Sequence, residues 1–311
     1  MDNSHYDVII LGAGPAGLTA GIYASRAKLR TLILNEGATG GQVTLTNEVA
    51  NYPGVETTMG YSLVNTMKNQ AKGFGCRIKS NIRVTSVDLS EKIKRVTVND
   101  TEQYSAHAVI LSPGGKPRML GIPGEEKFKG SGVSYCATCD GDFFTGKHVV
   151  VVGGGNSALE EAVALTSHAS RVTIVHQFDH FQAFEHAIDE VRNNNRISVI
   201  LESELREIYG DDNVRGVKIK HLPTGEISEL AADGIFIFIG YLPNTAFFKD
   251  IIEMSDSGEM IVTPGMETSI NGVFAAGDSI RKRYRQVTTA VADGTIAALS
   301  ATEYIRNSRA N

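Results

Sequence analysis

Short apolar runs that lead directly into glycine-rich turns dominate the pattern of this chain. The first run, at residues 6–11 (Tyr-Asp-Val-Ile-Ile-Leu), is nearly continuous and predicts a parallel strand buried on both faces. A Gly-Ala-Gly-Pro-Ala-Gly turn follows at 12–17, then a helix at 18–27 and an apolar strand at 31–34. This order of strand, glycine turn, helix and strand predicts a βαβ unit.

The same order returns in the second half of the chain. A Val-Val-Val-Val strand at 149–152 leads into Gly-Gly-Gly-Asn-Ser-Ala at 153–158, and a helix and the strand 171–175 follow. We therefore expect an α/β protein with two Rossmann-like dinucleotide-binding domains.

The rest of the pattern suggests that one domain is inserted into the other. Further elements are predicted at 61–74 (helix), 84–98 (two strands with a polar turn), 109–111 (strand), 184–193 (helix), 197–201, 214–221, 234–240 and 272–278 (strands) and 290–305 (helix). The last strand and helix come after the second unit is complete. We therefore expect a discontinuous first domain, 1–115 and 245–311, with the second domain, 116–244, inserted into it.

The spacing of small residues in both turns is that of a dinucleotide fingerprint. Glycines in the first turn let the backbone approach a pyrophosphate at a helix N-terminus, and an acid about 20 residues on accepts from a ribose hydroxyl. The fingerprint residues are Gly12, Gly14, Gly17 and Glu36 in the first unit, and Gly153, Gly155 and Ala158 in the second. Asn35 is a second polar candidate beside Glu36. A glycine turn in a unit that binds nothing remains the alternative.

A Cys-x-x-Cys pair, Cys136 and Cys139, stands between the two glycine turns. A structural zinc site needs four ligands, usually from a second such pair, and the sequence has none. The pair therefore favours dithiol redox chemistry over metal binding, and we expect no metal site. The third cysteine, Cys76, stands alone and is predicted to be a small buried apolar residue.

Composition excludes several classes of function. A net charge of −5 argues against a nucleic-acid partner, which would require a basic footprint. No apolar run is long enough to span a bilayer, and the polar first residues lack the basic region of a secretory signal. We expect a cytoplasmic protein that does not insert into a membrane.

With both glycine turns, the Cys-Ala-Thr-Cys-Asp segment between them and Gly277-Asp278 near the end, the chain resembles low-molecular-weight thioredoxin reductases over nearly its whole length. The resemblance implies a homodimeric flavoprotein with the FAD/NAD(P)-binding fold. It implies that FAD is held by Gly12, Gly14, Gly17, Glu36, Gln42, Asn51, Asp278, Arg285, Gln286 and Val287.

The resemblance also implies roles for the dithiol. Cys136 would attack thioredoxin, Cys139 would exchange electrons with the flavin, and Asp140 would carry the thiol proton, unless it is only a solvated turn residue. The inserted domain would have to rotate between the two tasks, with 114–115 and 240–243 as hinge segments.

One segment departs from the family pattern. NADPH-using members carry His-Arg-Arg-x-x-x-Arg after the second strand of the second unit, and these arginines bind the 2′-phosphate. Here the segment begins at His176, and Gln177, Phe178 and Gln182 replace the three arginines. Glutamine and phenylalanine cannot form the charge-assisted bonds that hold a phosphate dianion, so NADPH is not the expected donor.

Several donors stay open. NADPH bound weakly through His176, His180 and other cations is one, and NADH is another, although no acid ends the strand 171–175. Relatives that lack the arginines use ferredoxin, a reduced deazaflavin or a second flavin. Ferredoxin is the first choice, because the basic run 281–285 could steer an acidic partner, unless it is only a solvated loop.

Three functions compete for this sequence. The first is an FAD-dependent thioredoxin reductase with an unusual donor. The second is a flavin-dependent dithiol oxidase, or a reductase of a peroxiredoxin or small disulfide. The third is a redox sensor without turnover, which the intact dithiol segment disfavours.

Overall fold

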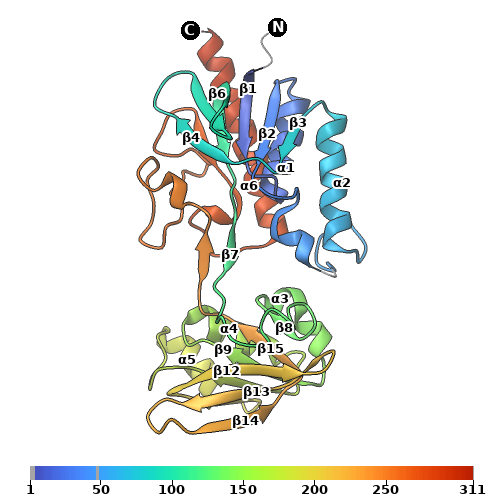
Figure 1. Ribbon diagram of the computed structural model, residues 1–311, viewed down its shortest axis with the longest axis vertical. Coiled ribbons are helices and arrows are strands. Elements are labelled where there is room, and N and C mark those ends of the chain that lie inside the picture. The colour runs from blue at the N-terminus through green and yellow to red at the C-terminus, as the bar shows by residue number, and fades with distance from the viewer. Residues whose placement is uncertain (1–3, 47–48, 311) are drawn as a thin grey trace. The chain divides into compact units, whose positions relative to one another are not determined.

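The computed structural model describes residues 4–46 and 49–310, so the predicted polar start of the chain lies partly outside the described residues. The chain forms two compact units (Figure 1). Unit 1 comprises Met1–Lys116 and Leu242–Asn311, and unit 2 comprises Pro117–Tyr241. The chain passes between them in β7 (Gly115–Pro117) and β16 (Tyr241–Pro243), which pair with each other. The boundaries fall at 116/117 and 241/242, where the sequence predicted 115/116 and 244/245.

Unit 1 is built on a seven-stranded sheet with the order β3-β2-β1-β6-β5-β4, in which β17 also pairs with β6. In β1, Ile9 lies opposite Leu32 of β2 and Val109 of β6, and all three are at most 1 % exposed. Both faces of these parallel strands are covered, which explains their uninterrupted apolar runs. The strands are β1 (His5–Leu11), β2 (Thr31–Asn35), β3 (Arg77–Ser80), β4 (Val84–Asp88), β5 (Lys94–Val98), β6 (Glu102–Leu111) and β17 (Val273–Ala275).

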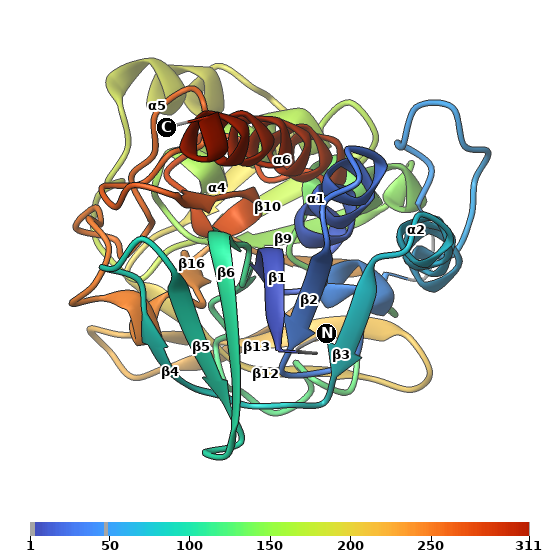
Figure 2. The same ribbon diagram turned by 90° about the horizontal axis from the view of Figure 1, so that it is seen from above.

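Helices α1 (Pro15–Arg26) and α6 (Val287–Ala310) lie side by side on one face of this sheet, as Figure 2 shows. A Cβ added to Gly294 of α6 would come within 2.2 Å of the backbone oxygen of Ala16, so glycine permits the close contact of the two helices. Helix α2 (Gly60–Gly73) packs against α1. No helix of the described residues has the length and apolarity needed to cross a bilayer.

Unit 2 has three layers around a parallel sheet with the order β11-β10-β9-β15-β8. The alternation along β9 shows this arrangement. Val149 and Val151 belong to a core shared with the helices, whereas Val150 and Val152 belong to a core shared with a three-stranded antiparallel sheet. The elements are β8 (Val133–Ser134), α3 (Ala137–Asp140), β9 (His148–Val152), α4 (Asn156–Leu165), β10 (Arg171–Val175), α5 (Glu185–Arg192), β11 (Ile197–Ile200), β12 (Ser203–Gly210), β13 (Val214–His221), β14 (Ile227–Ala231) and β15 (Gly234–Ile237).

The mixed α/β fold, with one large sheet in each unit whose central strands are parallel, confirms the predicted fold class. Two strands of the antiparallel sheet, β12 and β14, were not predicted. The pairing of β12 with β13 shifts register between Leu205 and Glu207, which breaks the alternation that marks a strand. Strand β14 (Ile-Ser-Glu-Leu-Ala) lies at the edge of its sheet and is mostly exposed. Its apolar residues do not alternate with polar ones, so the sequence shows no strand pattern there.

A buried glutamate anchors the segment that enters the dithiol. Glu125 is 1 % exposed, and its carboxyl group accepts from the backbone N–H of Leu120 at 3.0 Å and of Gly121 at 2.7 Å. It also accepts from the hydroxyl of Tyr135 at 2.8 Å, directly before Cys136. Its hydrogen bonds therefore link the start of unit 2 to the dithiol segment.

We expect Glu125→Ala to lower the free energy of unfolding by about 3 kcal/mol, because three hydrogen-bond donors lose the buried carboxyl group that accepts from them. Chemical denaturation followed by circular dichroism measures this. The neighbouring exposed Glu126 is the control, and Glu126→Ala should change the value by less than about 0.5 kcal/mol. Equal stability of the two variants would contradict the anchoring role.

Candidate active site

The first glycine turn lies between β1 and α1 and leaves one position open. Gly12 has φ +111°, and a Cβ there would lie 2.1 Å from the backbone oxygen of Ser112. A Cβ on Gly17 would lie 2.0 Å from the backbone oxygen of Gly12. Gly14 differs, because a Cβ there would meet no atom within 4 Å. Helix α1 has no side-chain cap, so its first N–H groups face this open space.

Segments distant in the sequence surround this turn. Asn35 at the end of β2 accepts from the N–H of Ala13 at 2.9 Å, whereas the exposed Glu36 accepts from the N–H of Val84 at 3.2 Å. A Cβ on Gly41 would lie 3.2 Å from the Cα of Gly14. The short 3₁₀ helix Gly41–Leu45, which carries the exposed Gln42, therefore lies against the turn.

Asp278 contributes a partly buried carboxyl group to the same region. Its Oδ1 is buried without a hydrogen bond and lies 3.3 Å from the Nζ of Lys282, while burial raises the pKa of this carboxyl. A Cβ on Gly277 would lie 2.8 Å from the Cβ of Ala16, which places this turn against the start of α1. Asn51 donates to Gln286 at 3.5 Å, directly before Val287, the first residue of α6.

These observations fit a bound dinucleotide. Phosphates and ribityl or ribose hydroxyls require open backbone, free N–H donors and polar side chains. The open glycine, the uncapped helix N-terminus, the buried carboxyl oxygen beside Lys282 and the two adjacent amides supply these features. Of the residues that the sequence assigned to FAD, Gly12, Gly14, Gly17, Gln42 and Asp278 therefore belong to segments that lie together in unit 1, and Glu36 is exposed.

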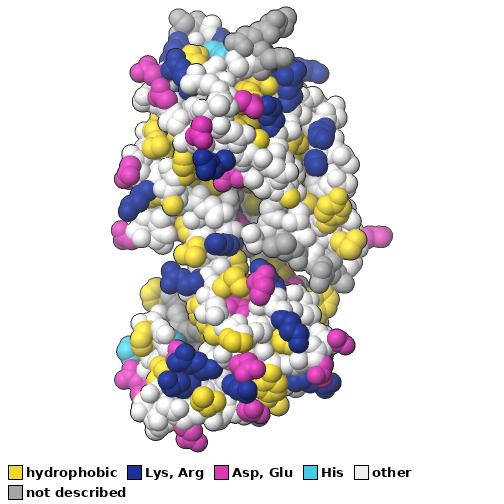
Figure 3. Space-filling model, viewed as in Figure 1, with side chains coloured by type: hydrophobic (Ala, Val, Ile, Leu, Met, Phe, Trp, Pro, Cys, Tyr) yellow, Lys and Arg dark blue, Asp and Glu magenta, His cyan; other side chains and the backbone are white. Residues whose placement is uncertain are grey.

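The basic run 281–285 is partly neutralised by neighbouring carboxylates. Lys282 pairs with Asp293 at 2.7 Å as well as with Asp278, and Arg285 pairs with Glu259. The exposed part of the run is Arg281, Arg283 and Tyr284. On the face drawn in Figure 3, Lys and Arg alternate with Asp and Glu without a large patch of one sign. The run is therefore a weaker docking patch than its sequence suggests.

The dithiol lies in unit 2, where β8 leads into the short helix α3. Cys136 and Cys139 form a disulfide. The Oδ2 of Asp140 accepts from the hydroxyl of Ser134 at 2.6 Å, and burial raises the pKa of the Asp140 carboxyl. Asp140 is partly buried, which is not the environment of a solvated turn residue. Ser134 was missed by the sequence analysis, because an isolated serine beside a dithiol carries no motif.

The second glycine turn lies between β9 and α4 and repeats the first. Gly153 has φ +137°, and a Cβ there would lie 2.3 Å from the backbone oxygen of Phe238 and 2.9 Å from the Cβ of Ala158. At Gly155 the nearest atom to an added Cβ is the backbone oxygen of Gln182, at 3.9 Å. Helix α4 has no side-chain cap. The backbone of this turn therefore keeps the form of a phosphate-binding loop.

The segment beside this turn carries aromatic and neutral side chains instead of arginines. His176 is 5 % exposed, and its ring packs on Gly154 and stacks on Phe181 with centroids 5.9 Å apart. Burial lowers the pKa of His176, which keeps the ring neutral. Phe178 is 40 % exposed. Residues 176–184 include no lysine or arginine, so this segment offers no fixed cation to a 2′-phosphate.

Two further features do not belong to the candidate active site. Cys76 is 4 % exposed, as predicted, and burial raises the pKa of its thiol to about 12. No group of three or more His, Cys, Asp or Glu among the described residues could hold a metal ion.

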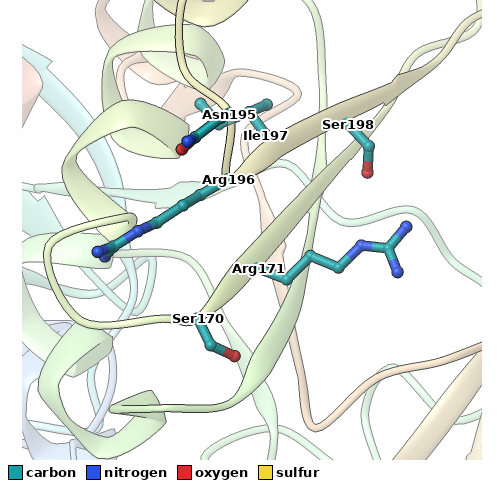
Figure 4. Close-up of a pocket in the computed structure, with 6 residues that line it drawn as sticks. All are labelled: Ser170, Arg171, Asn195, Arg196, Ile197 and Ser198. Atoms are coloured by element: carbon teal, nitrogen blue, oxygen red, sulfur yellow. The ribbon is translucent and has the colours of Figure 1, made fainter.

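An open polar pocket of about 590 Å³ lies at the N-terminal ends of β10 and β11 (Figure 4). Its two arginines, Arg171 and Arg196, extend in different directions, and Arg196 donates to the backbone oxygen of Thr166 at 2.7 Å. The second glycine turn follows the C-terminal end of β9, which is parallel to β10, and so lies at the opposite edge of the sheet. The pocket is therefore separate from the candidate nucleotide site of unit 2.

Comparison with known proteins identifies the family. The model of the pyridine nucleotide-disulphide oxidoreductase family matches residues 6–294. The chain is 44% identical to the 34.2 kDa protein in the rubredoxin operon of Clostridium pasteurianum, covering 98% of both chains. It is 45% identical to thioredoxin reductase of Peptoclostridium acidaminophilum, covering 96% of this chain and 97% of that protein.

A solved structure supports the same assignment. Thioredoxin reductase from Streptococcus pyogenes superposes with a TM-score of 0.93 at 40% identity, over 98% of this chain and 100% of that chain. The chain therefore belongs to the pyridine nucleotide-disulphide oxidoreductase family and, within it, to the low-molecular-weight bacterial-type thioredoxin reductases, which are FAD-binding oxidoreductases.

Proposed function

We propose that this protein reduces thioredoxin through Cys136 and Cys139 and takes its electrons from a reduced ferredoxin-type iron–sulfur protein. The observation that carries the choice of donor is the segment 176–184, which has no lysine or arginine and a neutral, buried His176. A segment of this kind cannot form the charge-assisted hydrogen bonds to the 2′-phosphate on which recognition of NADPH depends.

The dithiol has the parts needed for disulfide exchange. The thiolate of Cys136 attacks one sulfur of the thioredoxin disulfide, and the other thioredoxin sulfur leaves as a thiolate. Cys139 then attacks Cys136 in the mixed disulfide, which releases reduced thioredoxin and re-forms the Cys136–Cys139 bond. Asp140 holds or releases the thiol proton, because its carboxyl is partly buried and hydrogen-bonded beside the dithiol.

Unit 1 is the proposed FAD domain, and unit 2 is the proposed nucleotide-type domain that carries the dithiol. Bound FAD supplies the conversion between one-electron donors and the two-electron chemistry of a disulfide. In this proposal Gly14 leaves room for the pyrophosphate, and Asp278, Asn51 and Gln286 bind polar groups of FAD; the buried Oδ1 of Asp278 and the contact of the two amides support these roles. Gln42, Arg285 and Val287 complete the proposed set.

Two observations favour an iron–sulfur donor. The Clostridium pasteurianum relative is named for its place in a rubredoxin operon, and rubredoxin is a one-electron iron protein. On unit 1, Arg281, Arg283 and Tyr284 are exposed and form a basic and aromatic surface, which suits an acidic partner of modest affinity.

We further propose a cytoplasmic homodimer, and sedimentation of the holoprotein tests its quaternary structure.

Anaerobic reduction of the yellow holoprotein tests the proposal. NADPH, NADH and photoreduced ferredoxin are added separately, with thioredoxin present, and flavin absorbance and thioredoxin thiols are followed. We expect only ferredoxin to bleach the flavin and yield thioredoxin thiols. Bleaching by micromolar NADPH would contradict the proposal, and oxygen consumption with a reduced dithiol would indicate a dithiol oxidase instead.

Substitution in the second glycine turn separates the donors further. We expect Gly155→Val to leave ferredoxin-driven turnover within about twofold of the wild type, because a pyrophosphate at this turn is not part of the proposed path. The nearest atom to an added Cβ lies at 3.9 Å, so the backbone tolerates the change. The exposed Ser157→Ala in α4 is the control. A loss of more than about tenfold with ferredoxin would mean that the second turn binds an obligatory nucleotide.

A further inference from the structure

Ser134 is a buried hydroxyl that touches the dithiol segment at two points. It ends β8 and is 5 % exposed. Its Oγ donates to the Oδ2 of Asp140 at 2.6 Å and accepts from the backbone N–H of Cys136 at 3.1 Å. The backbone oxygen of Cys136 lies 3.3 Å from the same hydroxyl. The Ser134 side chain thus connects Cys136 and Asp140, the first and last residues of the Cys-Ala-Thr-Cys-Asp segment.

The geometry gives this hydroxyl two alternative acceptors for its single proton. A serine hydroxyl donates once and accepts through two lone pairs. With Asp140 charged, the short bond to its carboxylate is preferred, because hydrogen bonds to charged acceptors are the stronger ones. With Asp140 protonated, the hydroxyl can turn to the backbone oxygen of Cys136. The charge of Asp140 and the backbone of Cys136 are therefore coupled through Ser134.

We propose that Ser134 is a positioning residue for the thiol chemistry: it holds the Asp140 carboxyl beside the dithiol and sets how readily that carboxyl takes up a proton. The proposal deepens the proposed function, because it concerns the proton that accompanies the electrons. Reducing the Cys136–Cys139 bond consumes two electrons, which come from the proposed iron–sulfur donor, and two protons. A protonated Asp140 supplies one of these protons and is then reprotonated from water, and the second proton comes directly from water.

Opposing influences act on Asp140. Burial raises the pKa of its carboxyl, the hydrogen bond from Ser134 lowers it, and the nearby charge of Asp142 raises it. Two more titratable groups face the dithiol turn within unit 2. Glu161 of α4 lies by the backbone N–H of Ala137, and the ring of His168 lies 3.5 Å from where a Cβ on Gly141 would stand. Among these groups only Ser134 donates a hydrogen bond that favours the carboxylate of Asp140.

The test uses thiol exchange that needs neither thioredoxin nor ferredoxin. Holoenzyme reduced with dithionite and freed of excess reductant is mixed with 4,4′-dithiodipyridine in a stopped-flow instrument between pH 4 and 9. In the wild type we expect a rise in rate with pH that reports ionisation of Asp140 as a general base. Asp140→Asn should remove this step.

We expect Ser134→Ala to move the same step about one pH unit higher, which slows exchange about tenfold on the limb below the midpoint. Ser134→Thr, which keeps a hydroxyl, should restore most of the wild-type profile. Thr173→Val is the matched control, because it removes a buried hydroxyl of unit 2 whose partners are His148 and Ser198 rather than the dithiol. Its profile should match the wild type.

The proposal would be overturned if the rate of exchange rose with pH at the same midpoint in Ser134→Ala as in the wild type. A shift that persists in an Asp140→Asn background would do so as well, because the hydroxyl would then act through another group. Should the alanine variant not fold, Ser134→Gly carries the same expectation. Failure of ferredoxin or thioredoxin as partners would leave all of these outcomes measurable, since neither enters the assay.

Discussion

Replacement of Cys136 by serine is expected to lower thioredoxin reduction by about a thousandfold or more. A hydroxyl is neither acidic enough to ionise at neutral pH nor able to form a mixed disulfide, so the attack on thioredoxin is lost. Turnover of saturating oxidised thioredoxin with photoreduced ferredoxin measures the effect. FAD content should stay unchanged, because Cys136 lies in unit 2 and the proposed flavin residues lie in unit 1.

Cys76 provides the internal control for this experiment. It is buried in the core of unit 1, and burial raises the pKa of its thiol to about 12, so it stays protonated and unreactive. Cys76→Ala should keep at least about half of the turnover while losing some stability. If Cys136→Ser kept more than about a tenth of wild-type turnover, the dithiol would not be the path of electrons to thioredoxin.

The second large effect is expected at Gly14. We expect Gly14→Val to give a folded but colourless protein, with FAD affinity lowered about a hundredfold or more, equivalent to about 3 kcal/mol. Gly14 has φ −76° and ψ −176°, which valine adopts readily, and an added Cβ meets no protein atom within 4 Å. The new side chain therefore fills the space proposed for the pyrophosphate without disturbing the fold. Flavin absorbance per chain and circular dichroism measure the two properties.

Gly12 in the same turn should behave differently. With φ +111° and a Cβ that would lie 2.1 Å from the backbone oxygen of Ser112, Gly12→Val is expected to prevent folding of unit 1. A yellow, fully loaded Gly14→Val protein would show that FAD binds elsewhere. The pair of variants thus separates the loss of a cofactor site from the loss of a fold.

Elements whose structure depends on neighbouring residues in the chain could be predicted from the sequence. The order of strand, glycine turn and helix around Gly12–Gly17 and Gly153–Ala158 is local, since it is carried by consecutive residues of the chain. The central parallel strands, such as β1 and β9, are buried on both faces and therefore appear in the sequence as apolar runs. The bulged β12 and the exposed edge strand β14 lack such a pattern, and they were missed.

Side-chain partners far apart in the chain were beyond the sequence analysis. The run 281–285 reads as five residues of mostly positive charge, yet Asp293 and Glu259 neutralise Lys282 and Arg285. The contact of Asn51 with Gln286 joins positions from the two separate parts of unit 1. Such pairs form only in the tertiary fold, because the two partners are far apart in the sequence and no local pattern shows that they will meet.

The division of unit 1 into two stretches of chain has a consequence for the order of assembly in the cell. Pro117–Tyr241 leaves the ribosome complete, and unit 2 can fold, while unit 1 still lacks β17 and α6. Asp278 and Gln286, two of the proposed flavin ligands, are made only afterwards. We therefore expect nascent chains to acquire a folded dithiol unit first and to take up FAD last, so that a shortage of flavin would leave chains stalled with unit 2 formed and unit 1 open.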